Sequence, residues 1–156
     1  SPFAEAKSLN VGDTAPQVTG ITETGASLVL DEVYSAHDYT LVYFYPKADT
    51  PGCTAQGCSL RDAYEELLKA GVAIIGVSND KPAAQLAFKE KFHLPYTLIA
   101  DTEKTVIKAF GVPTTFGFAK RQAFLIKGGK IVWADLSAST SQQAADVLKV
   151  IAKQQG

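Results

Sequence analysis

The chain has 156 residues, 46% of them hydrophobic and 20% charged, and its formal net charge is −1 at pH 7. That length is enough for one domain with a sizeable core, so we expect a single domain over residues 1–156. A charge near zero without a basic block argues against nucleic acid as a partner, and no apolar run is long enough to cross a membrane. We expect a cytoplasmic protein; a periplasmic or organellar one stays open, because a targeting segment could have been removed.

Apolar periodicity and turn residues divide the chain into alternating strands and helices. Buried strands that alternate with helices predict an α/β fold, in which helices cover both faces of a central mixed β-sheet. The predicted elements, in chain order, are an N-terminal β-hairpin within residues 11–30, a strand at 40–45, a helix at 53–69, a strand at 72–78, a helix at 82–92, a strand at 97–99, a helix at 103–110, a hairpin formed by 123–126 and 130–133, and a helix at 141–154.

Both cysteines of the chain lie near the start of the predicted helix 53–69. Cys53 follows a buried strand and a turn that contains Thr50 and Gly52, which places it in the first turn of the helix. Backbone N–H groups there are unpaired and the helix dipole favours negative charge, so a thiol ionises more easily there than in free solution. Cys53 could instead be a small buried hydrophobic residue. The preceding glycine keeps the backbone accessible, which favours a reactive thiolate.

Cys58 lies five positions after Cys53. At about 100° and ~1.5 Å per residue, the two side chains point roughly 140° apart and their Cα atoms lie about 8–9 Å apart. A disulfide requires Cα atoms within about 7 Å, so the pair cannot bond while the helix is intact. Cys58 is then either a packing residue or a resolving thiol that captures a sulfenic acid on Cys53 after the helix start unwinds. Because the chain has no other cysteine, we favour the second interpretation.

Four residues near Cys53 in the sequence or in the predicted fold have both structural and catalytic explanations. Thr50 could cap the helix, or its hydroxyl could bond the thiolate and a bound oxygen. Pro46 could end the strand, or its ring could keep water from the sulfur. Arg121 begins a predicted strand and could present its planar fork to the sulfur and to a peroxide. Arg61, on the cysteine helix, competes for this role, although acidic neighbours could pair with it. Spacing alone does not decide between the two arginines.

Residues 43–54, followed by Cys58 and Arg61, resemble the active-site segment of peroxiredoxins. They most closely resemble the Q-type subfamily, also called bacterioferritin comigratory protein. The spacing of proline, threonine and cysteine is specific to that superfamily, and a second cysteine five residues later is typical of the Q type. The similarity covers nearly the whole chain and includes residues 76–78, 92–96, 111–113 and 121–126.

The resemblance implies a thioredoxin-like fold and a thiol-dependent peroxidase that reduces hydrogen peroxide and organic hydroperoxides. It implies that Cys53 is the peroxidatic cysteine and Cys58 the resolving one, that the two form an intrachain disulfide, and that thioredoxin or a similar dithiol reductant restores the thiols. No cofactor or metal is needed, and we expect a monomer. The other implied active-site residues, which bind or surround the peroxide, are Pro46, Thr50, Arg121 and the N–H groups of Gly52 and Cys53.

Three positions depart from the family pattern near the site. Gln56 stands where many members carry glutamate, and Ala123 and Lys127 replace residues that are commonly threonine and aspartate. These residues support the reacting groups without replacing them. The departures therefore concern the hydrogen bonds around the site and the substrate preference.

Two other functions are compatible with a two-cysteine α/β chain. A disulfide oxidoreductase or thiol carrier would share the fold, but the cysteines lack the two-residue spacing of such motifs. A metal-binding module would need further ligands, because two cysteines without methionine or a nearby histidine bind copper or zinc poorly. Both alternatives are therefore less favoured than a peroxidase.

Overall fold

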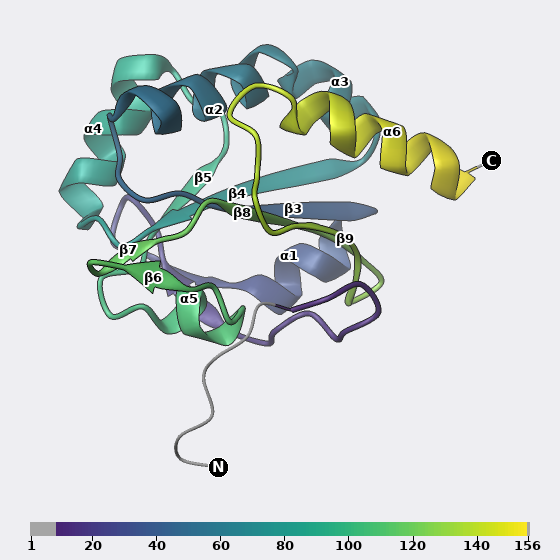
Figure 1. The fold of residues 1–156 in the computed structure, drawn as a ribbon, viewed down its shortest axis with the longest axis horizontal. Helices are drawn as coiled ribbons and strands as arrows, with labels where there is room; N and C mark the ends of the chain where they lie inside the picture. Colours follow the sequence, from purple (N-terminus) through teal and green to yellow (C-terminus); the bar gives the residue numbers. More distant parts are fainter. Residues whose placement is uncertain (1–8, 156) are drawn as a thin grey trace.

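The computed structural model describes residues 9–155, which are built around a five-stranded mixed sheet (Figure 1). The strand order is β5-β4-β3-β8-β9; β3, β4 and β5 are parallel, whereas β8 runs antiparallel to both β3 and β9. The strands of this sheet are β3 (Tyr39–Phe44), β4 (Val72–Ser78), β5 (Thr97–Ala100), β8 (Gln122–Lys127) and β9 (Lys130–Asp135). The predicted N-terminal hairpin is present as β1 (Thr19–Ile21) and β2 (Ser27–Val29).

Helices cover both faces of this sheet (Figure 1). One face carries α2 (Pro51–Asp62), α3 (Tyr64–Lys69), α4 (Pro82–Phe92) and α6 (Gln143–Gln155), and the other carries α1 (Leu30–Ala36) and α5 (Thr105–Ala109). Strand β3 is buried along its whole length, because Leu41 and Tyr43 face the first group of helices while Val42 and Phe44 face the second. The predicted α/β architecture with a mixed sheet is confirmed.

Three local features differ from the prediction. The helix expected over 53–69 is divided at Ala63, whose backbone (φ −95°, ψ 7°) ends α2 before α3 begins. Helix α1 and the small hairpin of β6 (Thr114–Thr115) and β7 (Phe118–Ala119) were not expected. Each is too short to produce a clear apolar period. The hairpin between β8 and β9 was predicted correctly, and its turn residues Gly128 and Gly129 both have positive φ.

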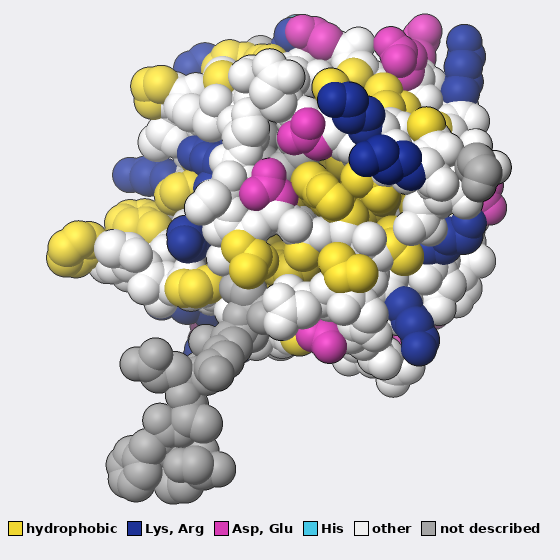
Figure 2. All heavy atoms as spheres, turned by 45° about the vertical axis from the view of Figure 1, so that its right-hand side comes forward, with side chains coloured by type: hydrophobic (Ala, Val, Ile, Leu, Met, Phe, Trp, Pro, Cys, Tyr) yellow, Lys and Arg dark blue, Asp and Glu magenta, His cyan; other side chains and the backbone are white. Residues whose placement is uncertain are grey.

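The surface of the described residues is of mixed character. On the face shown in Figure 2, acidic and basic side chains are interspersed, and hydrophobic side chains reach the surface between them. No helix in the described range 9–155 is long and apolar enough to cross a membrane.

Candidate active site

Cys53 lies in the first turn of α2, directly beyond the end of the central strand β3. Pro51 occupies the first helical position, where a missing N–H costs nothing. The first hydrogen bond of the helix runs from the N–H of Thr54 to the carbonyl of Thr50 at 2.8 Å, so the N–H groups of Gly52 and Cys53 precede it. Cys53 is only 1% exposed. The sulfur therefore lies at the positive end of the helix, as the sequence predicted. Its burial was expected only under the alternative interpretation, in which Cys53 is a small buried hydrophobic residue.

Arg121, which lies 68 residues after Cys53 in the sequence, brings a positive charge to this sulfur. It directly precedes β8, and the pairing of Gln122 with Phe44 places it beside the end of β3, where α2 begins. One terminal nitrogen of its guanidinium, Nη2, donates to Sγ of Cys53 at 3.4 Å. The other, Nη1, donates to Oε1 of Gln56 at 2.5 Å. The cation and the helix terminus both place positive charge beside the sulfur.

The loop between β3 and α2 is fixed by several polar contacts. The hydroxyl of Thr50 donates to the carbonyl of Lys47 at 2.7 Å, which leaves its oxygen free to accept. The N–H of Ala48 donates to Asp80 at 2.8 Å, and Asp49 forms an ion pair of 2.9 Å with Lys91. No bond between Thr50 and the sulfur is present among the described residues, so that contact stays a prediction. Pro46, half-buried, begins this loop.

Cys58 is half-buried and is a free thiol, like Cys53. The helix between them is continuous, so the two Cα atoms lie about 8–9 Å apart by helix geometry. A disulfide between them requires part of α2 to unwind, as the spacing predicted. The assignment of Cys58 as the resolving thiol stays a prediction.

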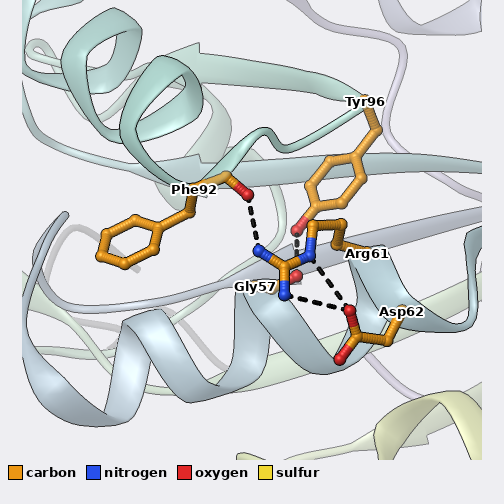
Figure 3. A network of polar contacts seen from close by, with 5 residues as sticks. All are labelled: Gly57, Arg61, Asp62, Phe92 and Tyr96. Carbon is orange, nitrogen blue, oxygen red and sulfur yellow. Dashed lines mark hydrogen bonds and ion pairs between the residues drawn. The ribbon is translucent and has the colours of Figure 1, made fainter.

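The guanidinium of Arg61 is directed toward Phe92 and Asp62 (Figure 3). Its Nη1 donates to the backbone carbonyl of Phe92 at 2.7 Å, and its Nε donates to Asp62 at 3.0 Å. The neighbouring Tyr96 hydroxyl donates to the carbonyl of Gly57 at 3.2 Å. These contacts join the second half of α2 to the connection between α4 and β5. Arg61 therefore contacts the neighbouring backbone and Asp62, whereas Arg121 is the arginine that contacts the sulfur.

Four buried residues around the cysteines had no catalytic assignment from the sequence. The hydroxyls of Tyr43 and Tyr96 lie 2.7 Å apart beneath α2. Burial raises the pKa of Tyr43 well above its usual value, and the neighbouring Tyr96 raises it further, so the phenol is neutral. Gln56 and Gln143 are linked by a hydrogen bond of 3.2 Å. Of these four residues, only Gln56 was noted in the sequence, as a departure from the family pattern. The hydrogen bonds of Tyr96 to Gly57 and of Gln56 to Gln143 join residues 39 and 87 positions apart, so no local sequence pattern indicates them.

Residues 11–134 match the model of the AhpC/TSA family. The chain belongs to this family. A putative peroxiredoxin bcp of Coxiella burnetii is 44% identical over 105 residues, which cover 67% of this chain and 68% of that protein. A chloroplastic peroxiredoxin Q of Gentiana triflora is 40% identical over 123 residues, or 77% of this chain and 56% of that protein. The chain spans 68% of the length of the Coxiella relative and smaller shares of others, down to 44% for a chloroplastic peroxiredoxin Q of Suaeda salsa.

Solved structures share the fold over nearly the whole chain. Peroxidoxin BcpB from Mycobacterium tuberculosis has a TM-score of 0.86 at 29% identity and covers 93% of this chain and 97% of its own. A bacterioferritin comigratory protein of Xanthomonas campestris, studied for alkyl peroxide reduction, has a TM-score of 0.82 at 26% identity, with coverage of 95% and 98%. The predictions of a Q-type peroxiredoxin, of its thioredoxin-like fold and of its enzyme class, a thiol peroxidase, are confirmed.

Proposed function

We propose that Cys53 is the residue that reduces the peroxide in this member of the AhpC/TSA family. The observation that supports this most directly is the 3.4 Å contact between the Arg121 guanidinium and the Cys53 sulfur at the start of α2. The thiolate attacks the terminal oxygen of a hydroperoxide, and a sulfur–oxygen bond forms as the O–O bond breaks. The leaving oxygen departs with the electron pair and takes up a proton, as water or as an alcohol, and Cys53 becomes a sulfenic acid.

The peroxide is held by groups that surround the sulfur. The N–H groups of Gly52 and Cys53 precede the first helical bond and can donate to the substrate oxygens, together with Arg121. The hydroxyl of Thr50 donates its hydrogen bond to the carbonyl of Lys47, so its oxygen accepts a hydrogen bond from the O–H of the peroxide. We expect the ring of Pro46, half-buried at the start of the loop, to keep water from the sulfur. The alkyl peroxide chemistry studied in the Xanthomonas relative supports organic hydroperoxides as substrates beside hydrogen peroxide.

Cys58 completes the oxidative half of the cycle. Once α2 unwinds locally, the Cys58 thiolate attacks the Cys53 sulfenic sulfur, a disulfide forms and the hydroxyl leaves as water. A dithiol reductant of the thioredoxin type then attacks this disulfide and restores both thiols. The half-buried position of Cys58 supports its access to such a partner.

We propose that one copy of the chain is sufficient for this cycle. Both cysteines and Arg121 come from the same chain, so the site needs no residue from a second copy, which supports a monomer. The two hydrophobic clusters share one sheet, which supports a single domain. The dithiol requirement fits a reducing compartment such as the cytoplasm.

The proposal is tested by peroxide consumption in the presence of thioredoxin, thioredoxin reductase and NADPH. Wild-type protein is expected to turn over repeatedly, whereas Cys53→Ser is expected to lose all catalysed consumption. Cys58→Ser is expected to consume about one equivalent rapidly and then accumulate sulfinic Cys53, which mass spectrometry detects. Continued turnover by Cys53→Ser would show that the reacting sulfur has been assigned wrongly.

A further inference from the structure

The small hairpin of β6 and β7 carries an aromatic side chain into solvent at its tip. Thr115 pairs with Phe118, so Phe116 and Gly117 form a two-residue turn, and their φ angles are 52° and 84°. Turns of this kind favour asparagine, aspartate or glycine at the first position, because a positive φ is strained for a residue with a bulky side chain. Phe116 is 95% exposed, so packing within the chain does not offset this strain.

The hairpin is held in place although its tip is exposed. Nδ2 of Asn79, directly after β4, donates to the carbonyl of Gly117 at 2.8 Å. Beside the turn, the side chain of Phe118 is also exposed, by 41%. A single exposed hydrophobic residue is common on protein surfaces. Two exposed aromatic rings on an anchored hairpin, one of them in a strained conformation, indicate instead a surface that contacts another body.

The segment that contains the hairpin is basic. Residues 104–134 include six lysine and arginine residues and no aspartate or glutamate, whereas the net charge of the whole chain is −1. Lys108 on α5 and Lys120, directly after β7, are both exposed. Glu103, just before this segment, is the nearest exposed acidic residue in the sequence. The charge of the chain is therefore distributed unevenly, with a positive excess around the exposed rings.

The lysine charges are available to an external partner. Nζ of Lys104 lies at the turn itself, 3.7 Å from the place that a Cβ atom on Gly117 would take. Within the described range 9–155, Lys104, Lys108 and Lys120 take part in no ion pair. Exposed aromatic rings and unpaired lysines on one surface are complementary to a partner that is apolar below and anionic above, which describes the interface of an anionic lipid bilayer.

The hairpin lies at the end of the central sheet where α2 begins (Figure 1). Lys120 directly precedes Arg121, whose guanidinium contacts the sulfur of Cys53 at 3.4 Å. Asn79, which anchors the turn, follows the carboxyl end of β4, the parallel neighbour of β3. A surface that binds the hairpin therefore faces the end of the molecule that carries Cys53.

We propose that this hairpin docks the protein on anionic membranes. The rings of Phe116 and Phe118 enter the headgroup region of the bilayer, and Lys104, Lys108 and Lys120 bind the anionic headgroups. The molecule then lies on the membrane surface without spanning it. Docking brings the Cys53 end of the molecule to the lipid, where apolar organic hydroperoxides partition.

Vesicle co-sedimentation of the full chain tests this proposal. The probes are vesicles of phosphatidylcholine alone and of phosphatidylcholine mixed with phosphatidylglycerol. Binding to the anionic vesicles is expected to exceed binding to the neutral ones at least tenfold, and to be largely lost at ~1 M salt, where the Debye length is roughly 3 Å. The double variant Lys104→Gln/Lys120→Gln is expected to bind anionic vesicles about 20-fold more weakly.

Phe116→Asn separates membrane binding from folding. Asparagine is preferred at this turn position, so thermal unfolding should occur at the same or a higher temperature than in the wild type. Binding to anionic vesicles should fall about tenfold, because the amide does not enter the apolar part of the interface. Leu68→Gln is the matched control, because Leu68 is 53% exposed but lies on α3, outside the basic segment. Its binding should equal that of the wild type.

Wild-type binding by Phe116→Asn, or equal binding to neutral and anionic vesicles, would overturn the proposal. Failure of the wild-type protein to sediment with anionic vesicles would also overturn it and would point to a protein as the partner of the exposed rings. The test does not depend on the proposed peroxidase chemistry, because Cys53→Ser is expected to bind vesicles as the wild type does.

Discussion

The hydroxyl of Tyr96 donates a hydrogen bond of 3.2 Å to the carbonyl of Gly57, the residue immediately before Cys58. The same hydroxyl lies 2.7 Å from that of Tyr43 on the central strand. Arg61 adds a second contact, to the carbonyl of Phe92, from the next turn of α2 (Figure 3). The half of α2 that contains Cys58 is thus joined to the sheet and to the end of α4. Any unwinding that brings Cys58 to Cys53 has to break or strain these contacts.

Tyr96→Phe is expected to make disulfide formation faster. Loss of the hydroxyl removes the bond to Gly57 and lowers the free energy of unfolding by about 1–2 kcal/mol, which favours the unwound form of α2. Rapid-quench trapping should show a several-fold faster loss of sulfenic Cys53, and mass spectrometry should show less sulfinic acid at high peroxide. Tyr45→Phe is the control, because it removes an equally buried hydroxyl that contacts Gln85 on α4 instead of α2. Equal acceleration in both variants would contradict this explanation.

Gly57→Ala is expected to have the opposite effect. A Cβ atom at this position would lie 3.5 Å from Leu94 and from the Tyr96 hydroxyl, which is ordinary van der Waals contact. Alanine also favours a helix interior over glycine by roughly 0.5–1 kcal/mol. Thermal unfolding should occur at a higher temperature, and disulfide formation after peroxide should be slower. Faster disulfide formation in a stabilised variant would show that α2 does not need to unwind.

Arg121→Lys is expected to lower the second-order rate with hydrogen peroxide by about 10²–10³-fold. Lysine keeps the charge, but a single ammonium cannot contact Cys53 and Gln56 at once as the fork does. Stopped-flow measurement of the first oxidation isolates this step from disulfide formation. Arg61→Lys provides the comparison, since Arg61 donates to Phe92 and Asp62, and the first oxidation of this variant should be little changed. Similar losses in both variants would contradict the assignment of Arg121.

The contrast between Arg121 and Arg61 shows which parts of the site could be predicted from the sequence alone. Cys53 was predictable because strand, turn and helix start are consecutive in the chain, and the helix terminus acts on the sulfur locally. Arg121 lies 68 residues away and was identified only through the family resemblance. Gln143 and Tyr96 meet α2 through tertiary packing, which no apolar period or spacing reports. The division of the cysteine helix at Ala63 was missed because neither proline nor glycine stands there.

Stability is expected to fall at alkaline pH. Burial raises the pKa of Tyr43, of Tyr45 and of Tyr96 above the ordinary value of 10.0. In the unfolded chain these phenols ionise near pH 10, whereas in the folded protein they are still neutral at that pH. Their contribution to the stability of the fold is therefore fully present below pH 10 and is lost as the pH rises above 10. Chemical denaturation between pH 9 and 12 measures the effect, with the pH range set by the ordinary tyrosine value. A free energy of unfolding that stays constant over this range would contradict it.

We propose that Cys53 and Cys58 form a peroxide-driven redox pair within one chain. The most direct test mixes fully reduced protein with one equivalent of hydrogen peroxide, measures the rate, counts free thiols and maps the peptides. We predict rapid loss of both thiols and an intrachain Cys53–Cys58 disulfide at every protein concentration. A reaction as slow as that of a free thiol, or an oxidised product in which Cys58 stays reduced, would contradict the account.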